Sequence, residues 1–281
     1  MNALRPLGSL LLERARQKRR KIGIGVTSPT DALIAGLRKA DEFCEPFLYG
    51  ADVPGFASVA SSTPEDALFT DLEGGAIDAA VRGQIHATPF RERFIRPYNR
   101  SFQPIEEMIT VFEFPDGRPL LVSPASNLTM GSVGEKEKLL DASIRFCQLV
   151  GLPVKIGLLA QCRDEDLLDA AGTSIEKTYR ETDRLAELYS GRFAVKNYGI
   201  DFEKAYEDGV TILIEPNGTT GNQVIRTLYF LKVVRFYGAP YMNATHIVVE
   251  AFKNGKDFPD IMMLASALAN SRTARGNGSV P

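Results

Sequence analysis

Cysteine and histidine are scarce in this chain of 281 residues, which has three cysteines and two histidines. The cysteines, Cys44, Cys147 and Cys162, are odd in number and widely spaced, so they form neither a disulfide framework nor a zinc-binding pattern. Each is expected to be a small buried hydrophobic residue. The chain also lacks H-E-x-x-H and G-x-S-x-G motifs, and no neighbouring pair of carboxylates stands out for glycosidic or two-metal chemistry. These absences argue against zinc-peptidase, serine-hydrolase and glycosidase chemistry, and no metal site is predicted.

Excess charge and long apolar runs are missing as well. The net charge is −2, which gives no global basic field for nucleic acid. No apolar run approaches the roughly 18 residues of a membrane span, and the N-terminus lacks the pattern of a signal peptide. We therefore expect a cytoplasmic protein with no nucleic-acid or membrane partner. A basic cluster at residues 14–21 predicts the solvated face of an N-terminal helix, with a phosphate or membrane contact as the alternative.

Apolar runs at strand length alternate with segments of helical spacing along most of the chain. Residues 21–26, 153–160, 210–215 and 244–252 indicate buried strands, and residues 28–40 and 133–151 indicate helices. Residues 115–117, Pro-Asp-Gly, predict the turn of an antiparallel hairpin. This order predicts an α/β protein with mostly parallel sheets and helices on both faces. We expect an N-terminal helix at 1–20, a first lobe at 21–130 plus 245–272, a second lobe at 131–244 and a disordered tail at 273–281.

The segment from Asn217 to Asn222 is the richest candidate for a ligand site. It reads as a loop between a strand and a helix that runs to about residue 237. Its glycines permit close approach of the backbone, its Thr and Asn side chains donate hydrogen bonds, and the positive end of the following helix favours a phosphate. The predicted phosphate contacts are Thr219, Thr220, Gly221, Asn222 and, further along the helix, Arg226. The alternative is a tight turn capped by its own hydroxyl groups.

Two further strand ends carry polar residues, and in parallel α/β proteins ligands gather at such ends. At the first, Arg82 and Gly83 precede His86, where the planar guanidinium of Arg82 suits an anion. His86 faces either a ligand or the protein interior. At the second, Arg163 lies where it can reach a cleft between the lobes. The bare G-x-G at residues 23–25 is a weak signal for a dinucleotide.

Several of these segments together resemble a known group of proteins. Residues 220–226, Thr-Gly-Asn and a basic residue, resemble the F-P-D-x-x-T-G-N-x-x-Y-K segment of phosphate acetyl and butyryl transferases. Residues 151–160 are similar to their G-x-x-P-K-V-A-x-L-S strand, and residues 75–88 to their A-D-G-x-V-x-G-A-x-x-T segment. The E-P-x-G-x-T-G-N loop and the A-x-R-G strand end resemble more closely a sister branch, the Mtx-type methyltransferase subunit X proteins, a methanogenesis marker family. The resemblance covers roughly residues 21–272.

The resemblance implies an isopropylmalate-dehydrogenase-like fold of the phosphate acyltransferase type, with two α/β lobes around a cleft and frequent pairing as a homodimer. In the acyltransferases the cleft holds coenzyme A and an acyl phosphate, and a Ser-Arg pair and an Asp assist the transfer. Here Phe252 and Lys253 stand at the Ser-Arg positions, and Asp260 or Asp257 at the Asp position. Phe donates no hydrogen bond and Lys makes no bidentate phosphate contact. The catalytic candidates are therefore Lys253 and Asp260, with His86 as a base.

The function implied by the resemblance is a transferase-fold protein that binds a phosphorylated or coenzyme A-like small molecule between its lobes, beside a methyl-transfer pathway. Coenzyme A is the candidate cofactor, and a methyltransferase or corrinoid protein is the candidate partner. Two alternatives stay open: an active phosphate acyltransferase, and a non-catalytic accessory subunit. A metal-dependent dehydrogenase of the same fold is the weakest reading, because its Asp cluster and Lys-Tyr pair are missing.

Overall fold

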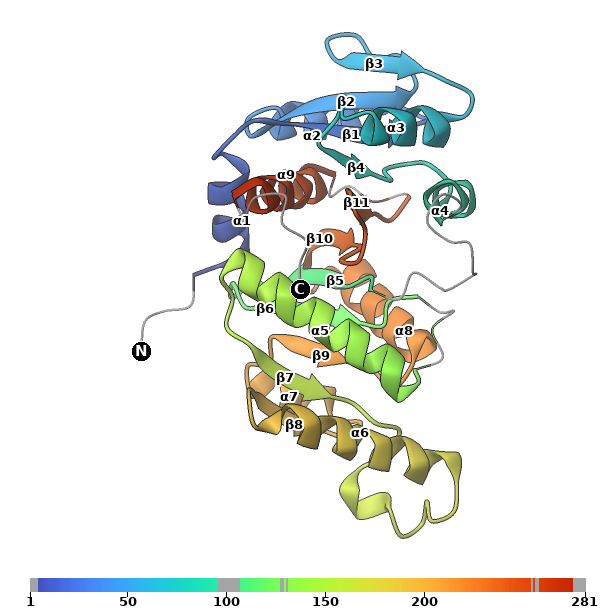
Figure 1. Ribbon diagram of the computed structural model, residues 1–281, viewed down its shortest axis with the longest axis vertical. Coiled ribbons are helices and arrows are strands. Elements are labelled where there is room, and N and C mark those ends of the chain that lie inside the picture. The colour runs from blue at the N-terminus through green and yellow to red at the C-terminus, as the bar shows by residue number, and fades with distance from the viewer. Residues whose placement is uncertain are drawn as a thin grey trace. The chain divides into compact units, whose positions relative to one another are not determined.

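The computed structural model describes residues 5–95, 107–126, 129, 131–253, 255 and 258–274. The chain forms two compact units, each built around its own β-sheet (Figure 1). Unit 1 contains residues 1–7 and 106–235, and unit 2 contains residues 8–105 and 236–281. None of the described helices is both long and apolar enough to cross a membrane.

Unit 2 has a sheet in the strand order β3-β2-β1-β4-β11-β10, in which β10 and β11 are antiparallel and the other neighbouring pairs are parallel. The strands are β1 (Arg20–Val26), β2 (Cys44–Gly50), β3 (Ala57–Ala60), β4 (Ala79–Val81), β10 (Arg235–Pro240) and β11 (Ile247–Glu250). The helices are α1 (Leu7–Ala15), α2 (Asp31–Ala40), α3 (Pro64–Glu73), α4 (Ala87–Ile95) and α9 (Phe258–Ala274). Helices α2 and α9 pack together on one face of this sheet, and α3 packs with α4 on the other (Figure 1).

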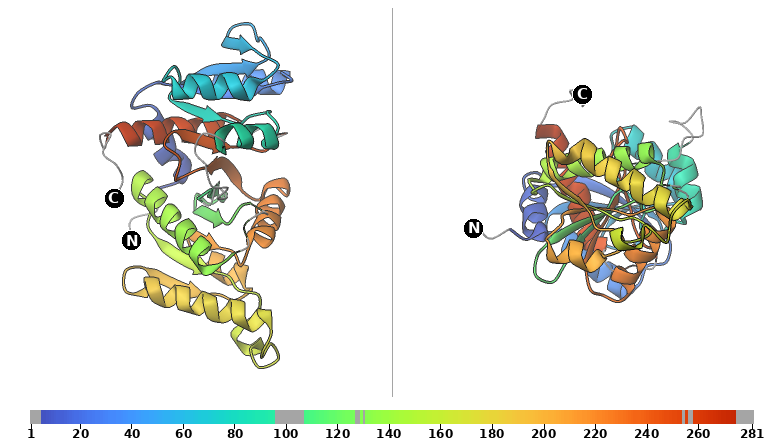
Figure 2. Two further views of the ribbon diagram at one scale, coloured as in Figure 1. Left: turned by 45° about the vertical axis from the view of Figure 1, so that its right-hand side comes forward. Right: turned by 90° about the horizontal axis from the view of Figure 1, so that it is seen from below.

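Unit 1 has a sheet in the strand order β5-β6-β9-β7-β8, parallel except for the β5–β6 hairpin. The strands are β5 (Thr110–Glu113), β6 (Pro119–Ser123), β7 (Lys155–Leu158), β8 (Ala194–Asn197) and β9 (Ile212–Ile214). The helices are α5 (Val133–Val150), the 3-10 turn η1 (Asp164–Asp166), α6 (Ser174–Ser190), α7 (Phe202–Glu207) and α8 (Gly218–Phe230). Helices α5 and α8 cover opposite faces of this sheet, and α6 packs beside α5 (Figure 2).

The predicted α/β class is confirmed, and so is the hairpin. Its turn forms because Gly117 adopts a positive φ of 84° and the Asp116 carboxylate accepts a hydrogen bond from the backbone N–H of Arg118 at 3.1 Å. Three free, buried cysteines also match the expectation, and burial raises the pKa of the Cys44 and Cys147 thiols to about 12. Such thiols are poor nucleophiles at neutral pH.

The prediction for the helix after Asn217 is wrong at both ends. Helix α8 begins at Gly218, so the predicted loop forms the first turn of the helix. It ends at Phe230 rather than near residue 237, because Lys232 adopts a left-handed conformation with a φ of 59°. The residues that follow are rich in β-branched and aromatic side chains, which favour a strand. They form β10.

The glycines of the G-x-G segment serve packing within unit 2. A Cβ atom at Gly25 would lie 2.3 Å from Ile85 and 2.6 Å from the carbonyl oxygen of Arg82. Gly83 has a φ of 57°, and a Cβ there would lie 2.2 Å from the carbonyl oxygen of Gly25. Close approach of these two backbones brings the chain segments after β1 and β4 together. The Gln84 side chain then closes the turn after β1, because its oxygen accepts from the backbone N–H groups of Thr27 and Ser28 at 2.9 Å each.

Candidate functional site

The site residues predicted from the sequence fall into two groups, one in each unit. Unit 2 holds Arg82, Gly83, His86, Lys253 and Asp260. Unit 1 holds Arg163, Thr219, Thr220, Gly221, Asn222 and Arg226. Among the described residues no group of three or more His, Cys, Asp or Glu side chains is placed to hold a metal ion.

His86 and Lys253 meet at the carboxyl edge of the unit 2 sheet. Strands β4 and β11 are parallel neighbours with Val81 opposite Val249, so the segments that leave them emerge side by side. The Nζ atom of Lys253 lies 2.7 Å from Nε2 of His86. An ammonium can only donate, so the ring nitrogen is the acceptor in this contact.

Helix α4 starts directly after His86 and adds to the positive character of this place. The carbonyl oxygen of His86 accepts from the backbone N–H of Phe90 at 3.2 Å, which makes it the start of the helical hydrogen-bond pattern. The N-terminus of a helix carries a partial positive charge. Thr88, in the first turn, is exposed. The pair and the helix end therefore form a solvent-accessible, electropositive centre.

Arg82 lies behind this centre and is 7% exposed. Its guanidinium donates to the carboxylate of Glu250, to the carbonyl oxygen of Ala251, and to that of Ile85 at 2.6 Å. Glu250 also accepts from the Tyr241 hydroxyl at 2.9 Å. Ile85 precedes His86, and Ala251 is two residues from Lys253. In this structure the guanidinium thus joins the two segments that carry the cationic pair, while its predicted contact with an anion stays a prediction.

Two other unit 2 positions bear on the family comparison. Asp260 lies in the first turn of α9, where a carboxylate is favoured by the helix dipole. The Phe252 ring packs against the Phe236 ring with 5.1 Å between centroids. Phe252, predicted at the serine position of the acyltransferase pattern, is therefore part of an aromatic contact.

The first turn of α8 in unit 1 is capped by its own residues. The Asn217 side-chain oxygen accepts from the backbone N–H groups of Thr219 and Thr220 at 3.0 Å each. The Asn222 amide donates to the carbonyl oxygen of Ala125 at 3.0 Å. A Cβ at Gly221 would lie 2.0 Å from the carbonyl oxygen of Pro124. A phosphate at this helix end must therefore replace the Asn217 oxygen as hydrogen-bond acceptor.

The two arginines predicted for unit 1 are engaged elsewhere in the same unit. The guanidinium of Arg226 lies 5.0 Å from the centroid of the Phe230 ring, toward the C-terminal end of α8. The Nε atom of Arg163 donates to the Asp201 carboxylate at 2.7 Å. The pKa of Asp201 is held below its ordinary value, first by the hydrogen bond from Lys204 and then by that from Arg163.

Glu215 is a notable group that the sequence reasoning did not assign. It follows β9 directly and is 2% exposed. A Cβ at Gly221 would lie 3.4 Å from its side chain, so it lies beneath the first turn of α8. Burial raises its pKa to about 7, and a hydrogen bond with the Thr220 hydroxyl opposes this shift.

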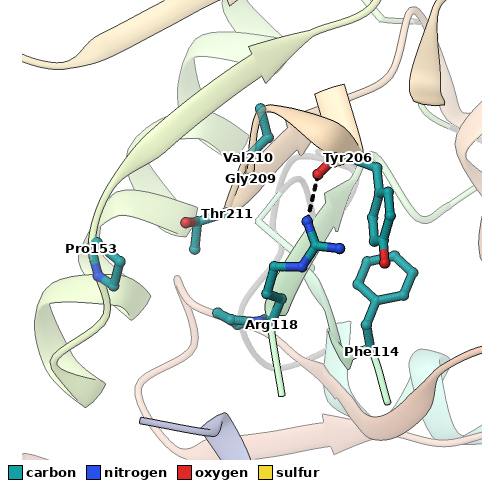
Figure 3. Close-up of a pocket in the computed structure, with 8 residues that line it drawn as sticks. Phe114, Arg118, Pro153, Tyr206, Gly209, Val210 and Thr211 are labelled. Carbon is teal, nitrogen blue, oxygen red and sulfur yellow. Dashed lines mark hydrogen bonds between the residues drawn. The ribbon is translucent and has the colours of Figure 1, made fainter. Parts of the chain in front are cut away.

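A small pocket lies at the opposite, amino edge of the unit 1 sheet (Figure 3). The Arg118 guanidinium lies 3.9 Å from the Tyr206 ring centroid and donates to the Tyr206 carbonyl oxygen at 2.7 Å. Phe114 meets the same ring edge-on at 4.5 Å between centroids. The cavity volume is about 60 Å³. That volume suits a few waters, but it is too small for a nucleotide-sized ligand.

No family model matches the chain. It is 23% identical over 276 residues to a Methanosarcina mazei protein named "Putative methyltransferase mtx subunit X", covering 93% of this chain and 95% of the relative. A protein of the same name from Methanosarcina barkeri is 24% identical over 275 residues, which cover 93% of this chain and 98% of that relative. The resemblance to the mtx subunit X proteins is confirmed.

Two solved structures are similar to this chain in fold. A branched-chain phosphotransacylase from Enterococcus faecalis has a TM-score of 0.62 at 14% identity, with 89% of this chain and 99% of that chain covered. A phosphotransacetylase from Streptococcus pyogenes has the same TM-score and identity, with 95% and 98% covered. The fold is that of the phosphotransacylases, as the resemblance implied.

Proposed function

We propose that the chain is a transferase-fold protein that binds a phosphorylated, coenzyme A-like small molecule through the His86–Lys253 pair. The observation that carries this proposal is the 2.7 Å contact between Lys253 Nζ and His86 Nε2. It lies where two neighbouring parallel strands end and a helix begins, which is the usual place for an anionic ligand in α/β proteins.

The pair gives the ligand two different contacts. Lys253 supplies an ammonium for a phosphate oxygen. A phosphate that takes this hydrogen bond also frees the Nε2 lone pair of His86, which stays the candidate base. Arg82 is a positioning residue in this scheme, since it holds the backbone beside both members of the pair. Asp260 stays a candidate catalytic residue in the first turn of α9.

Exchange of an acyl group between coenzyme A and phosphate is not the function we propose. The Phe252 ring offers no hydroxyl to a departing thiolate, and it packs against Phe236. Lys253 cannot form the bidentate contact that an arginine makes with a phosphoryl group. The phosphotransacylase fold is retained, while the side chains at these two positions favour binding over transfer.

The link to methyl transfer comes from the relatives' name. We extend it to this chain as a ligand-binding subunit that acts beside a methyltransferase or corrinoid protein, as a homodimer. The unit 1 residues Thr219, Thr220, Gly221 and Asn222 are proposed as a further ligand contact, formed when a ligand replaces the cap from Asn217. Arg163 and Arg226 join it only if they leave Asp201 and Phe230.

Lys253→Met is expected to weaken binding of inorganic phosphate and of coenzyme A about ten- to hundredfold, because it removes a charge-assisted hydrogen bond of about 1.5–3 kcal/mol. Isothermal titration calorimetry measures the change. Lys39→Met is the matched control, since Lys39 is an exposed lysine on α2 of the same unit. Equal affinities of wild type, Lys253→Met and Lys39→Met would contradict the proposal.

A further inference from the structure

Lys136 occupies a position that three physical rules disfavour. It lies in the first turn of α5 and is 2% exposed. Its Nζ atom has no hydrogen-bond partner. An unpaired buried ammonium is costly, and a cation at a helix N-terminus opposes the helix dipole. Burial lowers the pKa of Lys136, and this is only partly opposed by Glu181, whose carboxylate lies 3.8 Å from the ammonium of Lys177.

Two more buried atoms without partners lie at the same edge of the unit 1 sheet. They are Oγ of Ser123, the last residue of β6, and Oε1 of Glu215, which follows β9. The two strands end together, because the backbone N–H of Glu215 donates to the carbonyl oxygen of Ser123 at 2.7 Å. Helix α5 begins at this carboxyl edge, since it crosses the sheet from the end of β6 to the start of β7 (Figure 2). Within the described residues, Lys136 Nζ, Ser123 Oγ and Glu215 Oε1 are the buried side-chain atoms left without a hydrogen-bond partner.

A bound water alone does not explain this set. Water can satisfy a hydroxyl and a carboxyl group, but it does not neutralise an ammonium. An anion does, and it also suits the N-terminus of α5. The Glu135 carboxylate already caps the exposed side of that helix end, where it accepts from the backbone N–H and the hydroxyl of Ser132. The unfilled position is on the buried side, at Lys136.

We propose that the carboxyl edge of the unit 1 sheet binds an oxyanion, such as a phosphate group, with the Lys136 ammonium and the Ser123 hydroxyl as its contacts. The N-terminus of α5 opens to solvent, since Ser132 and Gly134 are exposed and a Cβ at Gly134 would meet nothing within 4 Å. The site uses neither the His86–Lys253 pair nor the first turn of α8, so it goes beyond the proposed function.

The test uses inorganic phosphate and the full chain carrying Lys253→Met, in which the unit 2 contact is removed. Adding Lys136→Met is expected to raise the phosphate dissociation constant at least tenfold by calorimetry. Without phosphate, the urea midpoint of this double variant is expected to equal or exceed that of Lys253→Met alone, because a buried ammonium is replaced by an apolar side chain of similar length. Lys138→Met is the matched control, because Lys138 is exposed on the same helix, and it should leave phosphate affinity unchanged.

Ser123→Ala is a second variant, which removes one donor and leaves Lys136 in place. It is expected to weaken phosphate binding and to keep the urea midpoint. The proposal is overturned if the Lys253→Met protein binds no phosphate, or if Lys136→Met binds phosphate as its parent does. The two proposals fail separately. If phosphate binding survives Lys253→Met in full and disappears with Lys136→Met, the result supports this site and contradicts the unit 2 site.

Discussion

Replacing Arg82 with methionine is expected to lower the free energy of unfolding by about 3–5 kcal/mol, the cost of leaving one member of a buried ion pair unpaired. The side chains of Arg82 and Glu250 are 8% and 11% exposed. Without the guanidinium, the partners left to the Glu250 carboxylate among the described residues are the Tyr241 hydroxyl and Arg91 at 3.7 Å. Urea unfolding followed by circular dichroism measures the loss.

Arg91→Met is the control for this prediction, because Arg91 contacts the same carboxylate from a side chain that is 39% exposed. A partly exposed ion pair of this kind contributes about 0–1 kcal/mol. The double variant Arg82→Met, Glu250→Gln should recover part of the loss, since it removes the unpaired charge and keeps a partner for Tyr241. If Arg82→Met and Arg91→Met cost the same, Arg82 does not hold the two segments together.

The second large effect concerns Glu215 and depends on pH. The folded pKa of about 7 lies above the ordinary value of 4.5, so the folded state binds the proton more tightly than the unfolded state. The contribution of Glu215 protonation to the free energy of unfolding is therefore fully present below pH 4.5. It is lost as the pH rises toward and through 7. A shift of about 2.5 pH units corresponds to about 3 kcal/mol at 1.36 kcal/mol per unit.

Glu215→Gln removes this titration while keeping the size of the side chain. Its stability relative to wild type is expected to rise by about 2–3 kcal/mol between pH 5 and pH 8, measured by urea unfolding at each pH. Glu203→Gln, an exposed change on α7 of the same unit, should show no such trend. If the stability of Glu215→Gln relative to wild type stays constant between pH 5 and pH 8, Glu215 is ionised in the folded protein. The positive end of α8 would then stabilise its carboxylate.

Local patterns predicted the parts of the fold that depend on neighbours in sequence. The Pro-Asp-Gly turn predicted the β5–β6 hairpin, and the helical spacing of residues 133–151 predicted α5, which Gly151 caps with a φ of 82°. Strand β10 was missed because the helical spacing continues beyond Phe230, and the left-handed Lys232 that ends the helix carries no glycine signal. Such an ending depends on packing in three dimensions.

The site was harder to predict, because a polar side chain's partner is invisible in a single sequence. Arg82 suited an anion by its type, but Glu250 lies 168 residues away in the chain and pairs with it. The spacing of Lys136 carries a signal in the sequence. Lys136 precedes Leu139, Leu140 and Ser143 at helical spacing, so it shares their buried face. A lysine on an apolar stripe is a sign of a buried charge and merits a functional hypothesis.

The central claim is that the ligand's phosphate reaches the His86–Lys253 pair, and the chain contains a built-in control for it. His86 and His246 are its two histidines, so proton–nitrogen NMR spectra of the imidazole rings contain two sets of signals. During a titration with coenzyme A at neutral pH, the His86 ring nitrogens are expected to shift because Lys253 exchanges its hydrogen bond for one to phosphate, while His246 stays unchanged. Stationary His86 signals at saturating ligand, or a shift confined to His246, would contradict the proposed function.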